Sequence, residues 1–359
     1  MPSRYELLRR EVEERRRRFA KPDLPVTIAL DVMGSENGPE EMLQGAYDAV
    51  VALPRVTVIC VGPAKKLQRL IREKGLTHPG LKVENAMEVV DMLDKPHDSL
   101  RKTNSSIAIA AKLVKEGIAQ GLVSPGNTGA TMATCMVQWR RLHGISRPAI
   151  ACILPHGRRR CLLLDVGANV DCKPRNLLHF AMMGSVFSQY MFHRTRPRVG
   201  LLSNGEEEIK GNQLVTESRE LLKQTGLNFC GNAEGRDLFK GSFDVVVCDG
   251  FVGNAVLKFG EGLAEFIMTN LKDEVQRSVM AQLGALAMIP AFRSFKKQVD
   301  HTEYGGAPLL GLNGTCIICH GSAPARSILN AIRVAEEQVA MRINERILEM
   351  LQATSVEPV

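Results

Sequence analysis

The chain has 359 residues, of which 45% are hydrophobic and 24% are charged, and its formal net charge is +7. This length allows one large α/β domain with an ample core, and no apolar run reaches the roughly 18 residues that a membrane-spanning helix needs. Aromatic residues make up only 5% and are not interleaved with the basic ones, so we do not expect nucleic acid as a partner.

Residues 1–24 form a basic extension that we expect to lie outside the fold. Its densest charge is the arginine run at 15–18, and a Pro-containing segment closes it before residue 26. It lacks the apolar segment of a secretory signal, and the cysteines lie mostly inside apolar runs, as reduced core cysteines do. We therefore expect a cytoplasmic protein.

Six apolar runs, many of them rich in β-branched residues, each end at a Gly-, Asn- or Asp-rich turn that leads into helix-like sequence. They lie at 26–31, 121–124, 161–165, 199–202, 243–248 and 316–319. This alternation predicts parallel strands of an α/β sheet, whose carboxyl ends should meet at one edge. Helix N-termini at that edge favour anions, so we expect one large crevice for a phosphate-bearing or carbonyl-bearing substrate.

The alternation of strand and helix signals continues without a long linker. We therefore expect residues 25–347 to form a single α/β catalytic domain, with either one lobe or two, followed by a tail at 348–359.

The turn after the second run offers hydrogen-bond donors and glycines for close backbone approach. It contains Ser124, Gly126, Asn127 and Thr128 at the expected start of a helix, which suits a phosphate or an oxyanion. The same composition is also typical of a turn that only connects two elements.

Carboxylates follow two other runs. Asp31 ends the first, and Asp165, Asn169 and Asp171 follow the third. One interpretation is a metal site, and the other is that these side chains cap helices and form turns.

Cations and amides follow the fourth and fifth runs. Glu206 and Lys210 would form an i,i+4 pair on a helix, which by itself would only stabilise a helix surface. A glycine and Asn212 follow directly, an unusual choice within a stable helix. Asn254 and Lys258 lie beyond the fifth run and again combine an amide with a cation.

The last run contains Cys316-Ile-Ile-Cys319-His320, which matches the short pattern for covalent haem attachment. The isoleucines between the cysteines favour a buried strand instead, and no second Cys/His pair has zinc spacing. The spacing of a dinucleotide fingerprint and the G-x-S-x-G elbow of a serine nucleophile are both missing.

Residues 278–297 are almost uniformly apolar and are divided by Pro290, which predicts two short helices hinged at that residue. An exposed apolar tip of this kind indicates a subunit contact, a membrane surface or a hydrophobic ligand. The side chains that we expect to contact lipid are Leu286, Ile289, Phe292, Lys296 and Lys297.

Taken together, the loops form a recognisable set. In chain order they are Asp31-Val-Met-Gly34 with Gly38-Pro39, Ser124-Pro-Gly-Asn-Thr-Gly-Ala130, Leu164-Asp-Val-Gly-Ala-Asn-Val-Asp171, Gly205-Glu-Glu-Glu-Ile-Lys-Gly-Asn212, Asp249-Gly-Phe-Val-Gly-Asn254 and Tyr304-Gly-Gly-Ala-Pro-Leu-Leu-Gly311. Over residues 26–335 the chain resembles the PlsX family of bacterial phosphate acyltransferases. Departures include Gly34-Ser35-Glu36 where the family usually has Gly-Gly-Asp.

The resemblance implies transfer of a fatty acyl group from acyl carrier protein to inorganic phosphate in phospholipid biosynthesis. A membrane glycerol-phosphate acyltransferase would consume the acyl phosphate. The resemblance also implies a homodimer, peripheral association with the membrane, and a three-layer α/β/α fold with a mostly parallel sheet, like that of isopropylmalate dehydrogenases and phosphotransacetylases.

Attack of phosphate on a thioester needs no metal, cofactor or covalent enzyme intermediate, because the thiolate is a fair leaving group. The protein must position the phosphate and stabilise the oxyanion. We assign catalysis to Lys210 and Asn254. The expected substrate contacts are Ser124, Gly126, Asn127, Thr128, Asn212, Lys258, His320 and Ser322. Carboxylates would repel phosphate, so the expected orienting residues are Asp31, Asp165, Asn169 and Asp171.

Two alternatives remain at this point. A phosphotransacetylase-type enzyme would use acyl-CoA, bind a 3′-phosphate nucleotide tightly and not respond to carrier protein. A non-catalytic module that recruits acyl carrier protein to membrane would bind the carrier without phosphate-dependent thiol release.

Overall fold

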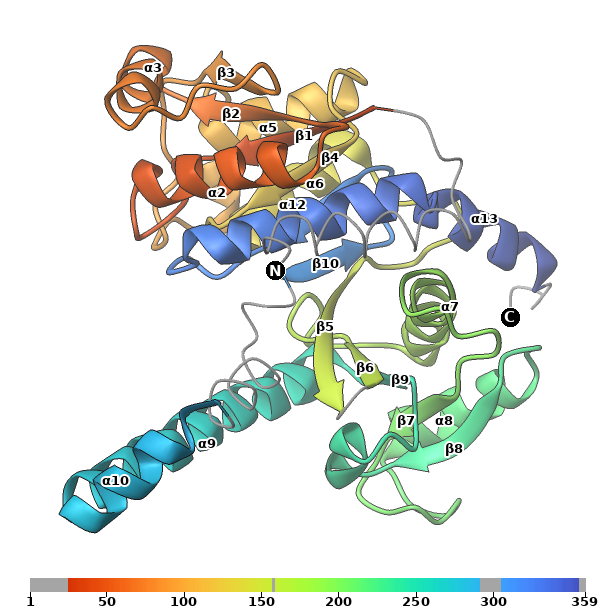
Figure 1. Ribbon diagram of the computed structural model, residues 1–359. Helices are drawn as coiled ribbons and strands as arrows, with labels where there is room; N and C mark the ends of the chain where they lie inside the picture. The colour runs from red at the N-terminus through yellow and green to blue at the C-terminus, as the bar shows by residue number, and fades with distance from the viewer. Residues whose placement is uncertain (1–24, 157–158, 291–304, 355–359) are drawn as a thin grey trace.

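A computed structural model describes residues 25–156, 159–290 and 305–354 (Figure 1). The basic extension at 1–24 lies outside the described residues, as do Phe292, Lys296 and Lys297 of the apolar segment and the last five residues.

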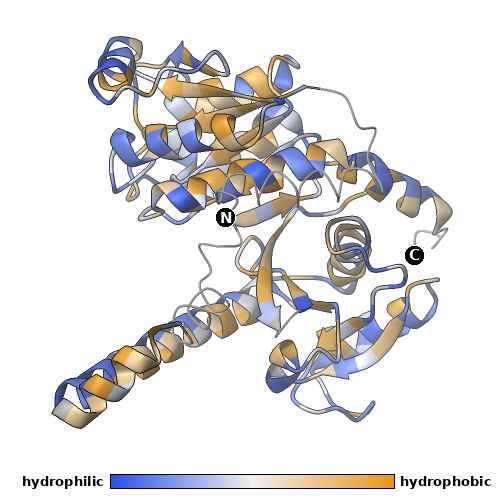
Figure 2. Cartoon of the chain, viewed as in Figure 1, coloured by the Kyte–Doolittle hydropathy of each residue, from blue (hydrophilic) through white to orange (hydrophobic). Residues whose placement is uncertain are grey.

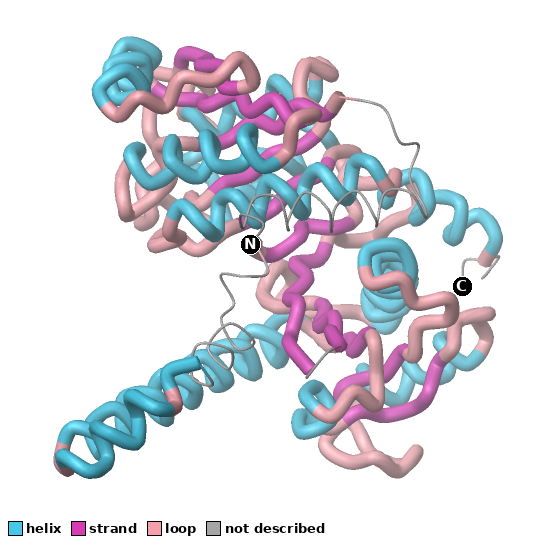
Figure 3. Tube along the Cα trace, in the orientation of Figure 1, coloured by secondary structure: helices cyan, strands magenta, loops and turns pink. Residues whose placement is uncertain are grey.

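Strands and helices alternate along most of the chain (Figure 3). The strands are β1 Val26–Asp31, β2 Val56–Gly62, β3 Leu81–Asn85, β4 Gly121–Ser124, β5 Ala149–His156, β6 Arg159–Leu164, β7 Val199–Leu202, β8 Phe229–Ala233, β9 Val245–Val247, β10 Ala307–Leu310 and β11 Thr315–Ile318. The helices are α2 Pro39–Ala52, α3 Ala64–Glu73, α4 Pro96–Ser99, α5 Ser106–Lys115, α6 Thr128–Trp139, α7 Pro174–Met191, α8 Gln213–Lys223, the 3₁₀ helix η1 Gly235–Phe239, α9 Gly250–Gln276, α10 Val279–Ala287, α12 Ala325–Ala340 and α13 Ile343–Ala353.

All six predicted strands are confirmed as members of one sheet. Within the described residues the sheet has 11 strands in the order β3-β2-β1-β4-β11-β10-β5-β6-β9-β7-β8. Most of its neighbours are parallel, and the exceptions are the three pairings that involve β10 and β5. The predicted α/β class with a mostly parallel sheet is therefore correct.

Helices cover both faces of the sheet, which gives three layers. Along β9, Val245 and Val247 pack into one core cluster with helices α7 and α12, while Val246 packs into a second cluster with α5 and α6. Because successive side chains of a strand point to opposite faces, strands covered on both sides need continuous apolar runs. This explains why the runs found in the sequence lack polar alternation.

The expectation that all carboxyl ends meet at one edge of a uniform parallel sheet is wrong. The block β3-β2-β1-β4-β11 and the block β6-β9-β7-β8 run in opposite directions, because three antiparallel pairings separate β11 from β6. The two blocks form the two lobes seen in Figure 1.

Strand β5 nevertheless brings the carboxyl ends of both blocks together. Its first two residues, Ala149 and Ile150, pair with β10, and the residues from Ala151 onward pair with β6. The blocks therefore occupy different lengths of the same strand. Leu164 at the end of β6 pairs with Ala151, close to the level reached by Ile318 at the end of β11. The crevice forms where the blocks meet and not along one edge.

A helical hairpin projects from the body of the protein. Helix α9 runs outward for 27 residues and α10 turns back against it (Figure 1). Helix α10 ends at Ala287, Met288 forms a turn, and Ile289 and Pro290 are again helical, so the expected second helix beyond that proline lies outside the described residues. No helix among the described residues has both the length and the apolar character to cross a membrane.

The sequence predicts a C-terminal tail from residue 348, but the last helix of the structure continues past that position. Helix α13 continues to Ala353, and Leu348, Met350 and Leu351 pack against the core. The predicted boundary at residue 348 missed this part of α13 because the helix is short and its apolar residues are separated by charged ones.

Candidate active site

A pocket of about 530 Å³ lies where the two blocks meet. Residues of β5, β10 and β11, the turns after β4 and β6, and helix α9 surround it. Its floor is mainly apolar and is formed by Ile150, Cys152, Ile153, Val166, Ile318 and Cys319. Its rim carries the exposed polar side chains of Thr128, Asn254, Lys258, His320 and Ser322.

The turns after β1 and β4 support each other beneath this pocket. The buried hydroxyl of Ser124 donates to Oδ2 of Asp31 at 2.9 Å and accepts from the backbone N–H of Gly126 at 3.1 Å. A side chain at Gly34 would lie 2.7 Å from the Cα of Gly126, so the contact between the turns requires glycine. The structure thus places Ser124 as a support of the turn, while its predicted contact with substrate stays a prediction.

Burial raises the pKa of the Asp31 carboxyl, and hydrogen bonds from Ser106 and Ser124 oppose that rise. The carboxylate faces the two turns and not the pocket, since its oxygens accept from Ser124 and from the backbone of Gly34. This position agrees with an orienting role.

The side chain of Asn127 is fully engaged by its own surroundings. Its Oδ1 caps α6 by accepting from the backbone N–H of Ala130 at 2.9 Å. Its Nδ2 donates to the carbonyls of Met92 and Asp94 at 2.7 and 3.1 Å. Of the predicted phosphate-binding motif, the exposed side chain of Thr128 remains available at the rim.

Asp165 organises the point at which the two blocks join. Its Oδ1 accepts from the N–H groups of Ile150 and Ala168, and its Oδ2 accepts from the backbone and the side chain of Asn169, at distances of 2.7 to 3.1 Å. The Nδ2 of Asn169 also donates to the carbonyl of Pro148 at 2.7 Å. Burial raises the pKa of the Asp165 carboxyl, and these hydrogen bonds oppose the rise.

These contacts argue against the metal interpretation of this turn. N–H donors occupy both oxygens of Asp165, and Asp171 is exposed on the surface of the turn. Within the described ranges, three acids lie close enough to share an ion, namely Glu206, Glu234 and Asp237. Arg236 forms ion pairs with the first two, which accounts for the cluster without a metal.

The first turn of α9 presses against the Asp165 turn and positions Asn254. Asp249 caps the helix, and a side chain at Gly253 would lie 1.9 Å from the carbonyl oxygen of Asp165. Asn254 lies beside Gly167 on the exposed rim, and its predicted catalytic role stays a prediction. One turn further, Lys258 pairs with Glu261 at 2.8 Å, and both line the pocket.

The loop that carries Lys210 differs from the prediction. Residues 203–212 form turns and not a helix, and Glu206 pairs with Arg236 at 3.1 Å, so the predicted pair of Glu206 with Lys210 is wrong. Asn212 caps α8 by accepting from the backbone of Val215 at 3.0 Å. The structure does not bring Lys210 or Asn212 into the lining of the pocket.

Lys210 is exposed, and it makes no ion pair with any other described residue. Its loop follows β7, which is the parallel neighbour of β9, with Leu201 paired to Val247. The loops that carry Lys210 and Asn254 therefore start side by side, and the catalytic role of Lys210 stays a prediction.

His320 and Ser322 face the pocket from the turn after β11. The hydroxyl of Ser322 lies 2.8 Å from Nδ1 of His320, and the backbone N–H of Ser322 donates to the same nitrogen at 3.3 Å. Because an N–H can only donate, Nδ1 is an acceptor, and the neutral ring carries its hydrogen on Nε2. Ser35 and Asn37 of the first loop hold this turn by hydrogen bonds to its carbonyls.

The pocket contains two free thiols, of which Cys319 is buried and Cys152 is half-buried. Burial raises the pKa of Cys152 and of Cys319 to about 12, so both stay protonated and weakly nucleophilic near neutral pH. Cys316 is buried within β11, in agreement with the interpretation of Cys316-Ile-Ile-Cys319 as a strand.

The sequence prediction missed the apolar floor supplied by β5. The signal was present, since two short apolar runs at 149–154 and 161–164 flank a segment that contains proline and glycine, a pattern typical of a hairpin. Only the second run was interpreted as a strand, because no polar site motif follows the first.

The architecture is that of the phosphotransacetylases. A phosphotransacetylase from Streptococcus pyogenes matches with a TM-score of 0.63 at 18% identity, over 94% of this chain and 99% of that one. The EutD phosphotransacetylase from Staphylococcus aureus matches with a TM-score of 0.61 at 17% identity, over 92% of this chain and 99% of that one. Identities this low show the fold alone.

The chain belongs to the phosphate acyltransferase family. The family model described as fatty acid synthesis protein matches residues 26–346. The phosphate acyltransferases of Syntrophotalea carbinolica and Heliobacterium modesticaldum are each 49% identical to it, over 91% and 92% of this chain and 94% and 99% of theirs. The protein is therefore an acyltransferase, and the resemblance drawn from its loops is confirmed.

Proposed function

We propose that the protein transfers a fatty acyl group from the thioester of acyl carrier protein to inorganic phosphate, which yields acyl phosphate for phospholipid biosynthesis. The observation that carries this proposal is a pocket with an apolar floor and a polar rim in a chain of the phosphate acyltransferase family. An apolar floor suits an acyl chain, and rim donors suit phosphate and the thioester oxygen.

In the proposed reaction a phosphate oxygen attacks the thioester carbonyl carbon and forms a tetrahedral intermediate. Its oxyanion then reforms the carbonyl, the C–S bond breaks, and the carrier leaves as a thiolate that takes up a proton. Asn254 and Thr128 are the exposed rim donors for the oxyanion and the phosphate. Lys210, exposed on the loop beside the start of α9, would add a positive charge when phosphate is bound.

His320 and Ser322 would bind the phosphate from the opposite rim. With Nδ1 accepting from the hydroxyl and the backbone N–H of Ser322, His320 can offer Nε2–H as a donor to a phosphate oxygen. The Ser322 hydroxyl would turn from Nδ1 to a phosphate oxygen when phosphate is bound. The buried carboxylates of Asp31 and Asp165 and the half-buried amide of Asn169 would hold the turns that present these donors, without meeting the phosphate.

The proposed homodimer rests on the exposed face of α9. Phe251, Phe259 and Phe266 are 67%, 72% and 64% exposed, and their spacing places them on one face of the helix. A projecting helix with exposed phenylalanines needs a partner surface, and a second copy would bury each stripe against its equivalent.

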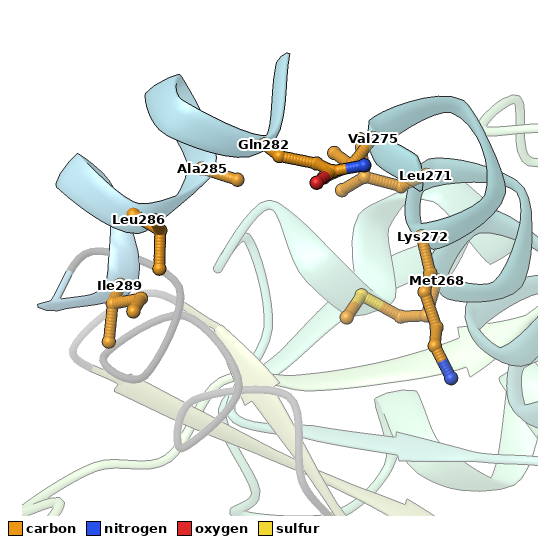
Figure 4. A pocket seen from close by; sticks show the side chains of 8 residues that line it. All are labelled: Met268, Leu271, Lys272, Val275, Gln282, Ala285, Leu286 and Ile289. Atoms are coloured by element: carbon orange, nitrogen blue, oxygen red, sulfur yellow. The ribbon is translucent and has the colours of Figure 1, made fainter. Parts of the chain in front are cut away.

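The proposed membrane contact is helix α10 of the hairpin, where Figure 2 shows hydrophobic segments beside hydrophilic ones. Helix α10 has two faces. Gln282, Ala285, Leu286 and Ile289 line a groove of about 450 Å³ opposite Met268 and Leu271 of α9 (Figure 4). Met280 and Leu283 are exposed and do not line this groove. Apolar side chains at such a tip can enter the headgroup region of a bilayer.

Membrane contact fits the chemistry of the product. An acyl phosphate hydrolyses readily and its long chain is poorly soluble, so release beside a membrane would favour direct use. We propose that a membrane glycerol-phosphate acyltransferase consumes it.

The decisive experiment mixes the protein with palmitoyl acyl carrier protein and measures free thiol with and without inorganic phosphate. Thiol release that depends on phosphate, with acyl phosphate as product, is expected. Binding of the carrier without release would instead support a recruiting module. Equal or better turnover with palmitoyl-CoA would support a phosphotransacetylase-type substrate.

Two variants separate the membrane from the subunit contact. Leu283→Glu changes the outer face of α10 and should lift the protein off anionic vesicles while the dimer stays intact in size-exclusion chromatography. Leu286→Glu changes the groove face and should disturb the hairpin as well. Dissociation of the dimer by Leu283→Glu would show that this face is a subunit contact.

A further inference from the structure

The free edge of β5 forms part of the pocket wall. Beyond Ile150, β5 pairs with β6 on one side, and β10 no longer follows it on the other. The pocket lies along this open edge, and for that reason the neighbouring residues Cys152 and Ile153, whose side chains point to opposite faces of the sheet, both line it.

Ile153 also lines a second, much smaller cavity of about 20 Å³ behind the pocket. The side of this cavity nearest α7 is apolar, since Phe187 and Met191 line it and pack in the same core cluster as Ile153, whereas Arg160, Arg333 and Glu337 line the rest. Among the described residues, Ile153 is the one that lines both this cavity and the active-site pocket.

We propose that Ile153 sets the length of the acyl chain that the enzyme accepts. The inference rests on the proposed function, because it requires that the acyl chain occupies the apolar floor of the pocket. A chain that enters from the polar rim meets the floor at β5, and the side chain of Ile153 limits how far its terminal methyl group can advance.

The expected size of the effect follows from apolar burial. Each methylene group that moves from water into an apolar site contributes roughly fourfold in affinity, so one two-carbon step in chain length corresponds to about fifteenfold. Replacing Ile153 with alanine removes three carbons and joins the pocket to the small cavity. Replacing it with phenylalanine fills space that the wild-type pocket leaves open.

The test measures kcat/KM for phosphate-dependent thiol release with carrier proteins charged with myristate, palmitate or stearate. Ile153→Ala should raise the ratio of stearoyl to palmitoyl carrier by about fifteenfold. Ile153→Phe should raise the ratio of myristoyl to palmitoyl carrier by a similar factor. Opposite shifts from the two variants are the signature of a residue that limits chain length.

Ile59 of β2 provides a matched control. Ile59 and Ile153 are both 8% exposed, and Ile59 lines neither cavity. Ile59→Ala should lower stability and leave the chain-length ratios unchanged. Ile153→Val removes a single methyl group, so it preserves the fold if the larger changes do not, and it should shift the ratios in the same direction as alanine.

The inference would be overturned if Ile153→Val is active with unchanged chain-length ratios and the same holds for each of the other two Ile153 variants that folds. That result would leave the proposed function intact. A wild-type protein that releases no thiol with any of the three carriers would overturn the proposed function itself.

Discussion

Two sets of polar side chains meet at the active-site pocket, one buried beneath the turns and one exposed at the rim. Asp31, Ser124 and Asp165 are buried, and their oxygens are engaged by neighbouring donors. Asn254 and Thr128 are exposed at the rim. A substitution in the first set should therefore act through the fold, and a substitution in the second should act on turnover at nearly constant stability.

The largest expected effect is that of Asp165→Ala. It leaves four N–H donors around Ile150, Ala168 and Asn169 without their acceptor, and each unsatisfied buried donor costs about 1–3 kcal/mol. We expect the free energy of unfolding to fall by roughly 3–5 kcal/mol, measured by urea denaturation. Asp171→Ala, an exposed carboxylate on the same turn, should change it by less than about 0.5 kcal/mol. Equal stability of the two variants would contradict the supporting role of Asp165.

Asn254→Ala should separate turnover from stability most clearly. Loss of an oxyanion donor costs about 2.7–4 kcal/mol of barrier, which is a hundredfold or more in rate, whereas an exposed rim residue adds little to the fold. The measurement is kcat for thiol release together with the urea midpoint. Asn270→Ala, another exposed asparagine on α9, should leave both unchanged. Normal turnover of Asn254→Ala would remove it from the active site.

Lys210→Ala tests whether an exposed cation outside the pocket lining belongs with the rim. We expect a loss of about a hundredfold in turnover, from missing neutralisation of phosphate, with an unchanged urea midpoint. Lys82, an exposed lysine on β3 at the far edge of the sheet, is the matched control. If Lys210→Ala and Lys82→Ala turn over equally fast, the loop after β7 takes no part in the reaction.

A buried histidine, His179, should make the stability of the fold depend on pH. Its Nδ1 accepts from the backbone N–H of Ser146 at 3.0 Å, and burial together with the charge of Arg175 lowers its pKa to about 4. The unfolded chain binds a proton near pH 6.5, so stability is complete above that pH and falls between 6.5 and about 4, by about 2–3 kcal/mol.

His179→Asn keeps an acceptor without the titrating ring and should flatten this part of the profile of unfolding free energy against pH. An identical profile in wild type and variant would show that His179 does not titrate in this range.

The smallest expected effect is that of Asn127. Asn127→Ala removes the cap of α6 and the ties to Met92 and Asp94, and should cost about 1–2 kcal/mol of stability in thermal or urea unfolding. Asn127→Asp keeps the capping oxygen and loses only the hydrogen bonds to the carbonyls of Met92 and Asp94, so it should lower the free energy of unfolding by less. If Asn127→Ala instead lost turnover at full stability, Asn127 would contact substrate directly.

The sequence by itself determined the fold class and the set of turns that form the site. Short apolar runs rich in β-branched residues and bounded by turn residues predict strands of a covered sheet, and β1, β4 and β7 begin and end where those runs do. The order of the loops was enough to identify the family, and the polar residues after β4, β9 and β11 do reach one pocket.

Only the tertiary structure decided which of those polar residues support the turns and which face the pocket. Ser124 and Thr128 belong to the same turn, yet one is buried against Asp31 and the other is exposed at the rim. Burial and hydrogen-bond partners come from elements far apart in the chain, so a local pattern does not specify them. The pocket itself arises from the register of β5 between two oppositely directed blocks, a long-range pairing that no turn motif encodes.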